Sequence, residues 1–114
     1  MINFVIAHKA EASAILQHWK LKKNNETNPY PVYQNNGVKL IISGSGKTQS
    51  AAATSWLAAT QSNLQRQNSI WLNVGIAGHQ SLPLGSTIIA NKLLDTATER
   101  SWFPTLINNQ LPSN

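Results

Sequence analysis

Residues 69–95, SIWLNVGIAGHQSLPLGSTIIANKLLD, are the stretch that decides the fold of this chain. An apolar segment, residues 69–74, runs into a turn of small residues at 73–78. A tight turn at 83–85 leads into a second apolar segment, residues 86–94. Glycine permits both unusual dihedral angles and a close approach of the backbone to another group. The stretch therefore predicts two buried strands joined by a loop near a ligand, which in α/β sheets lies beyond the carboxyl ends of the strands.

Composition predicts one soluble domain of 114 residues, with 41% hydrophobic and 11% charged residues. The absence of cysteine excludes disulfides, thiol catalysis and cysteine-ligated metals. None of the three histidines forms an HxH or HxxxH pair, so we expect no metal and no cofactor. The longest apolar runs are strand-sized and the N-terminus lacks a leader pattern, so we expect no membrane association and a cytoplasmic location.

The net charge of +5 reflects scarce acids more than abundant bases. The basic residues are scattered, apart from Lys20, Lys22 and Lys23 at the end of an expected helix, so nucleic acid is not an expected partner. The scarcity leaves few candidates for a catalytic carboxylate, namely Glu11, Glu26, Asp95 and Glu99.

The order of elements predicts an α/β fold with a mixed central sheet flanked by helices. The expected strands are residues 2–7, 32–34 (an edge strand), 38–42, 69–74 and 86–94, and the expected helices are 10–20 and 49–64. Asn36-Gly37 predicts a hairpin turn, and Thr48 is the expected N-cap of the second helix. Residues 22–31 and 62–68 are polar and predict loops.

Gly46-Lys47-Thr48 resembles the end of a P-loop, but Ile41 stands where that motif needs another glycine. The dinucleotide fingerprint fails as well, because Gln49 stands at its third glycine. Two readings of the turn at residues 43–47 stay open. It exposes backbone N–H groups that hold an anion or a polar ligand edge, or its glycines serve conformation alone.

Glu11 lies at the start of the first helix, at the expected carboxyl edge of the sheet. It is either a general acid or base or a glutamate that complements the helix dipole. His8 and His79 also follow strands, where they either contact a ligand or have a structural role. Asp95 is expected to form a turn or cap a helix.

Four segments together resemble the purine nucleoside phosphorylase and uridine phosphorylase superfamily. They are Ala7-x-x-x-Glu11, Ser43-Gly44-Ser45-Gly46-Lys47 with the alanines at 51–53, Asn73-Val74-Gly75-Ile76-Ala77-Gly78, and residues 84–90, LGSTIIA. The resemblance is nearest to the branch of methylthioadenosine/S-adenosylhomocysteine nucleosidases and futalosine hydrolases. It implies a phosphorylase/hydrolase-like fold and cleavage of the N-glycosidic bond of a purine-type nucleoside.

The resemblance also implies site residues. Glu11 matches the acid that positions or activates the attacking water, and Ser45 and Gly46 match the turn that lines the ribose and nucleophile pocket. Ile76, Ala77 and Gly78 match the loop that contacts ribose and base, although several nucleosidases have serine in place of Ile76. Glu11 favours hydrolysis over glycosyl transfer to phosphate, because neither arginine stands at a phosphate position that we recognise.

The segments match only the first half of such a domain, so we expect residues 1–114 to be its N-terminal portion. The family's Met-Glu pair and the aspartate that protonates the leaving base are missing from the sequence. We therefore expect weak nucleoside binding and little or no turnover, with a homo-oligomer or a missing C-terminal half as partner. The alternative is a non-catalytic nucleoside-binding or interaction module of the same fold.

Overall fold

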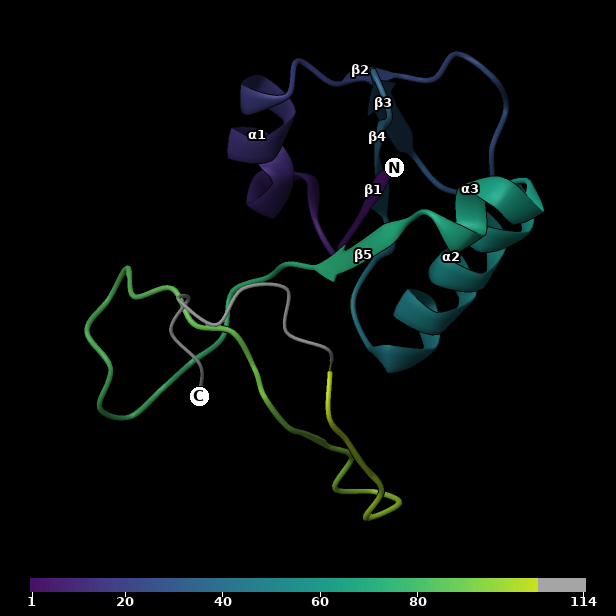
Figure 1. The fold of residues 1–114 in the computed structure, drawn as a ribbon. Helices are drawn as coiled ribbons and strands as arrows, with labels where there is room; N and C mark the ends of the chain where they lie inside the picture. The colour runs from purple at the N-terminus through teal and green to yellow at the C-terminus, as the bar shows by residue number, and fades with distance from the viewer. Residues whose placement is uncertain (105–114) are drawn as a thin grey trace. The chain divides into compact units, whose positions relative to one another are not determined.

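The computed structural model describes residues 1–104, which form parts of two compact units (Figure 1). The first unit is Met1–Ala77, and the second begins at Gly78. The expectation that residues 1–114 belong to one larger domain stays a prediction. No helix among the described residues has the length and apolar character needed to cross a membrane.

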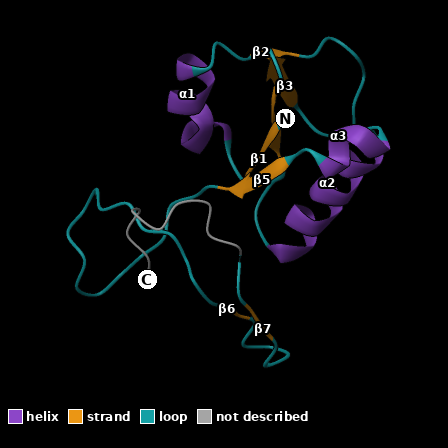
Figure 2. Ribbon diagram, viewed as in Figure 1, coloured by secondary structure: helices purple, strands orange, loops and turns teal. Residues whose placement is uncertain are grey.

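The first unit is built on a mixed five-stranded sheet in the order β2-β3-β4-β1-β5, which confirms the expected fold class (Figure 2). The central strand β1 (Ile2–Ile6) is parallel to β4 (Val38–Ile42) on one side and to β5 (Ile70–Asn73) on the other. β3 (Val32–Asn35) pairs antiparallel with β4, and β2 (Lys22–Lys23) pairs antiparallel with β3.

Helices cover both faces of this sheet. Successive buried side chains of β1 point to opposite faces, so each face has apolar residues for a helix to pack against. Phe4 and Ile6 pack with Leu40 on the face of α1 (Lys9–His18). Val5 packs with Leu57 on the face of α2 (Lys47–Ala59). Figure 1 shows α1 on one side of the sheet and α2 with α3 (Asn63–Gln67) on the other. The first unit is therefore a three-layer α/β sandwich.

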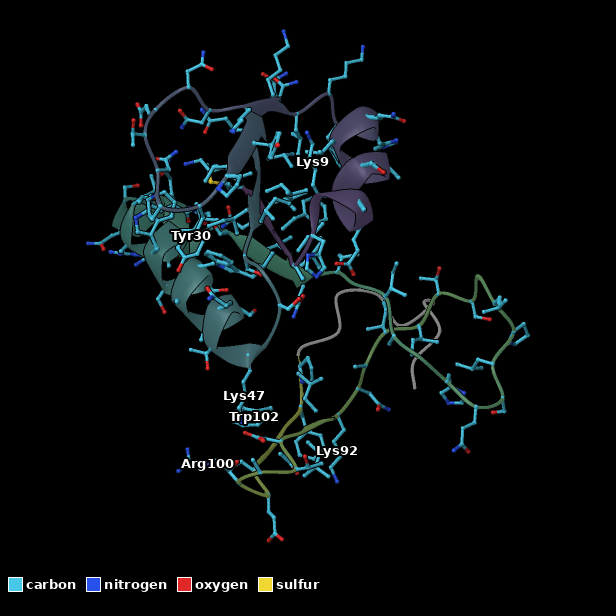
Figure 3. The ribbon with its side chains drawn as sticks, turned by 180° about the vertical axis from the view of Figure 1, so that it is seen from behind. Lys9, Tyr30, Lys47, Lys92, Arg100 and Trp102 are labelled. Atoms are coloured by element: carbon cyan, nitrogen blue, oxygen red, sulfur yellow. The ribbon has the colours of Figure 1, made fainter. Side chains whose placement is uncertain are left out.

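Aromatic residues from loops and strands extend these two layers. Tyr30 lies against α2, with its ring centroid 6.1 Å from that of Trp56 (Figure 3). On the other face, Nζ of Lys9 lies 5.9 Å from the ring centroid of Tyr33. These contacts tie the chain between β2 and β4 to both helices.

The β3–β4 hairpin forms as predicted, with positive φ at both Asn36 (42°) and Gly37 (80°). The prediction that β3 is an edge strand is wrong, because Lys22 and Lys23 add β2 outside it. These lysines lie in a polar segment without a strand pattern, and it is pairing with β3 that makes them extended.

The second predicted helix differs from the observed one at both ends. Gly46, with φ of 92°, is the N-cap of α2 rather than Thr48. The helix ends at Ala59, and α3 follows where a loop was expected. Ser62 and Gln65 form a capping box there: Ser62 Oγ accepts from the Gln65 N–H at 3.2 Å, and Gln65 Oε1 accepts from the Ser62 N–H at 3.0 Å. This reciprocal cap starts a new helix and so explains the break.

Residues 69–95 contribute one strand to the five-stranded sheet rather than the two that were predicted. β5 lies where it was expected, but the prediction that it is buried is wrong, because Ile70 is 42% exposed at the edge of the sheet. The predicted strand at 86–94 is also wrong, since only Leu93–Leu94 is extended, as β6. A strand needs a neighbour to complete its hydrogen bonds. Residues 86–92 add no strand to the five-stranded sheet.

The described part of the second unit, residues 78–104, contains a short hairpin. β6 pairs antiparallel with β7 (Ser101–Trp102). Asp95 Oδ1 accepts a hydrogen bond from the Ala97 N–H at 3.0 Å, which confirms the turn-forming role predicted for Asp95. Trp102 and Phe103 are both exposed, and Nζ of Lys92 lies 6.0 Å from the Phe103 ring centroid. Figure 3 labels Lys92, Arg100 and Trp102 in this hairpin.

Candidate functional site

The parallel strands β4, β1 and β5 end at the same edge of the sheet, so the segments that follow them converge there. Two backbone hydrogen bonds tie the turn after β4 to the end of β1. The Ser43 N–H donates to the Ile6 carbonyl at 2.9 Å, and the Gly44 N–H donates to the Ala7 carbonyl at 3.0 Å. The residues after β1 and β4 are therefore held beside each other.

Glu11 reaches the segment after β5 from the first turn of α1. Its Oε2 accepts a hydrogen bond from the Ile76 N–H at 3.0 Å. A Cβ atom built on Gly75 would lie 3.4 Å from the same oxygen, an ordinary van der Waals contact. The second oxygen, Oε1, is buried and accepts no hydrogen bond from the described residues. One carboxylate oxygen is thus fixed, and the other keeps its capacity to accept a proton or a hydrogen bond.

His8 and Ser45 form a direct side-chain contact at this edge. Ser45 Oγ lies 2.7 Å from His8 Nε2. His8 is the N-cap of α1, and its carbonyl accepts from the Glu11 N–H at 3.1 Å. Sequence reasoning treated the two residues separately. His8 lies two residues beyond the end of β1 and Ser45 three residues beyond the end of the neighbouring parallel strand β4, so their proximity was predictable, but not their direct contact.

The turn after β4 also borders a surface hollow of about 550 Å³. Gly44 and Gly46, with φ of 83° and 92°, give this turn its shape. The hollow is lined mainly by small and hydroxyl-bearing side chains together with one lysine: Ala7, Ser43, Gly44, Gly46, Lys47, Ser50, Ala51, Thr54, Ser55 and Asn73. Of the predicted site residues, only Gly46 is among them.

The other predicted site residues are placed as follows. Ile76 meets Glu11 through its backbone, and its side chain is 85% exposed. Ala77 is exposed at the end of the first unit, and Gly78 is the first residue of the second. His79 has a local structural role, since its Nδ1 accepts from the N–H groups of Ser81 and Leu82, both at 3.1 Å. Within residues 1–104, no three His, Asp or Glu side chains lie together as metal ligands would.

At the level of sequence, no protein-family model and no curated protein matches this chain. Its fold nevertheless resembles solved structures of 5′-methylthioadenosine/S-adenosylhomocysteine nucleosidases. The enzyme from Neisseria meningitidis, in complex with methylthio-immucillin-A, is 21% identical with a TM-score of 0.65, over 97% of this chain and 49% of that one. The Streptococcus pneumoniae enzyme, with a transition-state inhibitor, is 23% identical with a TM-score of 0.64, over 97% and 50%.

A third structure of this kind, from Helicobacter pylori with 5′-methylthioadenosine in its active site, is 15% identical with a TM-score of 0.63. It covers 96% of this chain and 50% of that one. The expected phosphorylase/hydrolase-like fold is thereby confirmed. The chain spans about half the length of the structures that it resembles.

Proposed function

We propose that this chain contributes the water-activating half of a nucleosidase site. Such a site hydrolyses the N-glycosidic bond of a purine-type nucleoside. The observation that carries the proposal is the Glu11 carboxylate, with Oε2 held by the Ile76 N–H at 3.0 Å and Oε1 free to accept. The similarity of the fold to nucleosidases supports the substrate class.

In the proposed reaction, Glu11 Oε1 accepts a proton from a water molecule as the water oxygen bonds to the anomeric carbon of the sugar. The carbon–nitrogen bond breaks, and its electron pair leaves with the base, which takes up a proton. The transition state resembles an oxocarbenium ion, as in glycoside hydrolysis. The Ile76 N–H holds Oε2, which leaves the buried Oε1 as the oxygen with capacity to take the proton.

Substrate contacts are proposed for Ser45 and Gly46 in the turn after β4 and for Ile76, Ala77 and Gly78 after β5. Hydrolysis is favoured over transfer to phosphate. Arg66, one of the two arginines, donates hydrogen bonds to the Ala58 carbonyl and to Asn63. Its side chain therefore stabilises the junction of α2 and α3.

The reaction also needs an acid at the departing base, and we propose that a part of the site outside residues 1–114 supplies it. β5 pairs only with β1 among the described strands, so its outer edge offers unpaired backbone groups. A missing C-terminal half or a second copy of the chain would add there. We expect such an assembly to act on nucleosides in the cytoplasm, whereas the isolated chain binds weakly and turns over little.

The test is a comparison of the chain with Glu11→Gln, which keeps the shape of the side chain and removes the base. Binding of inosine, 5′-methylthioadenosine and futalosine would be followed by NMR titration, and base release by chromatography. We expect binding by both proteins, and slow base release from the unsubstituted chain alone. Failure of all three nucleosides to bind would overturn the proposal.

A non-catalytic nucleoside-binding module is the second candidate. It is favoured by the hollow beside α2, whose lining does not include Glu11. In this case Glu11→Gln would leave binding unchanged, and no base would be released by the chain at any concentration or with added partner. Ser50→Trp, which fills the hollow, would then abolish binding.

A further inference from the structure

The two edges of the five-stranded sheet differ in charge. β2 forms one edge, and both of its residues, Lys22 and Lys23, are exposed. β5 forms the other edge, where residues 69–74, SIWLNV, carry no charged side chain. Lysines on an edge strand oppose its pairing with another chain. Two copies that met along β2 would place lysines opposite lysines, whereas two copies that met along β5 would bring no like charges together.

We propose that β5 pairs antiparallel with β5 of a second copy of this chain, so that the two sheets become one. The partner at this edge is then the same chain rather than a different protein. An antiparallel pair of identical strands has two-fold symmetry, and each copy offers the surface that it meets on the other. The inference goes beyond the proposed function, because the pairing needs no nucleoside.

The directions of the backbone groups fix the register of this pair. The Ile70 and Val74 N–H groups donate to carbonyls of β1, so the backbone groups of Trp71 and Asn73 point away from β1. In one register, Trp71 of each copy exchanges hydrogen bonds with Asn73 of the other. Every other antiparallel register leaves one of these two residues unpaired or needs a residue outside β5 (Ile70–Asn73). The favoured register places the two-fold axis at Leu72.

The same register brings apolar side chains together on the α1 face of the sheet. Leu72 packs against the cluster of Phe4 and Ile6 on that face, and Ile70 and Val74 share the face because side chains alternate along a strand. Ile70 is 42% exposed and Val74 is 37% exposed. Across the pair, Leu72 lies opposite Leu72, and Ile70 lies opposite Val74 of the second copy. Each exposed apolar side chain is thereby covered by another, which favours association.

The chain contains no cysteine, so single introduced cysteines can report the register through disulfide formation. Leu72→Cys would place both thiols at the two-fold axis, where the Cα atoms of a non-hydrogen-bonded pair lie about 4.5 Å apart. A disulfide spans that distance. The two copies of residue 70, or of residue 74, would lie about 13 Å apart along the strands, which is too far. Oxidised glutathione would serve as the oxidant that accepts the electrons of the two thiols.

Linked dimer would be followed over time on non-reducing gels. Leu72→Cys should link at least about tenfold faster than either Ile70→Cys or Val74→Cys alone. Leu64→Cys, at an exposed position on α3, is the control for random collisions and should be as slow as these two.

A mixture of Ile70→Cys and Val74→Cys tests the same register with Leu72 intact, and so does not depend on the folding of Leu72→Cys. Mass spectrometry distinguishes the products, and mixed dimers should outnumber self-linked ones by about tenfold. In sedimentation velocity, the unsubstituted chain should show a dimer fraction that rises with concentration.

Equal linking rates at all four positions would overturn the inference, as would a statistical ratio of products in the mixture. A chain that stays monomeric up to the concentration of an NMR sample would overturn it as well. Each of these results would leave the proposed function standing, since a missing C-terminal half can complete the sheet at the same edge.

Discussion

The carboxylate of Glu11 and the backbone N–H of Ile76 are joined by a hydrogen bond of 3.0 Å, although 65 residues separate them in the chain. This bond connects the first turn of α1 with the segment that leaves β5. The same carboxylate lies close to Gly75, where a Cβ atom would come within 3.4 Å of Oε2. The position of the proposed catalytic oxygen thus depends on a backbone segment that contributes no side chain to it.

Glu11→Ala should loosen the segment after β5. Losing one hydrogen bond of this kind costs about 1 kcal/mol, which corresponds to about fivefold faster exchange of the Ile76 amide hydrogen. Glu11→Gln should have a smaller effect, because its amide oxygen can still accept. Amide hydrogen exchange followed by NMR measures both. Glu26→Ala, in an exposed loop, is the control, and equal Ile76 exchange in all four proteins would contradict the observed contact.

Gly46→Ala should destabilise the first unit through backbone strain alone. The position has φ of 92°, and a Cβ atom there would meet nothing within 4 Å. A non-glycine residue held in this region costs about 1–3 kcal/mol. Chemical denaturation followed by circular dichroism gives the change in the free energy of unfolding.

Gly78→Ala is the matched control for that substitution. A Cβ atom at Gly78 also meets nothing within 4 Å, but its φ lies outside the positive range. The change in the free energy of unfolding should therefore be near zero, or stabilising by a few tenths of a kcal/mol (about 0.4). Equal destabilisation by both substitutions would show that strain at residue 46 is not the cause.

Local patterns in the sequence were sufficient to predict much of the first unit. Asn36-Gly37 specified the hairpin, and the continuous apolar runs specified β1 and β4, because these features depend on neighbours along the chain. β2 was missed since Lys22 and Lys23 become a strand only by pairing with β3. The apolar run at 86–94 predicted a strand for the opposite reason. Its composition suits a strand, but residues 86–92 pair with none of the five strands of the sheet.

The candidate site was predicted as positions rather than as contacts. The sequence indicated that Glu11, Ser45 and Ile76 follow three different strands. Because these strands are parallel, the segments that follow them meet at one edge of the sheet. The pairing of Ser45 with His8, and the use of the Ile76 backbone rather than its side chain, depend on side-chain directions that no periodic pattern encodes.

Asn3 and Gln61 provide a test of how β1 is joined to the break between α2 and α3. Both side chains are buried, and Gln61 Nε2 donates to Asn3 Oδ1 at 2.9 Å, while Asn3 Nδ2 donates to Gln61 Oε1 at 3.4 Å. Gln61→Ala leaves the buried Asn3 amide without this partner, which costs about 1–3 kcal/mol. Asn3→Ala should cost less, because Gln61 still donates to Met1 Sδ at 3.5 Å and accepts from Ser69 Oγ at 3.4 Å.

The double substitution Asn3→Ala/Gln61→Ala should therefore destabilise by less than the sum of the single ones. A coupling energy of about 0.5–3 kcal/mol is expected for residues in such contact, measured by urea denaturation of the four proteins. Asn63 and Arg66, an exposed pair on α3, serve as the control cycle and should show a coupling near zero. Strict additivity at Asn3 and Gln61 would contradict a shared hydrogen-bonded pair.

The outer edge of β5 should show an alternating pattern of amide protection. The Ile70 N–H donates to the Met1 carbonyl at 2.8 Å and the Val74 N–H to the Val5 carbonyl at 3.2 Å, so every second amide of this strand faces β1. The N–H groups of Trp71 and Asn73 then point away from β1. In the isolated chain these two amides should exchange at least about tenfold faster than those of Ile70 and Leu72.

If a missing half or a second copy adds a strand at this edge, raising its concentration should slow exchange at Trp71 and Asn73 and leave the exposed Asn25 amide unchanged. Slow exchange at Trp71 and Asn73 in the dilute monomer would show that the edge is already covered by this chain itself.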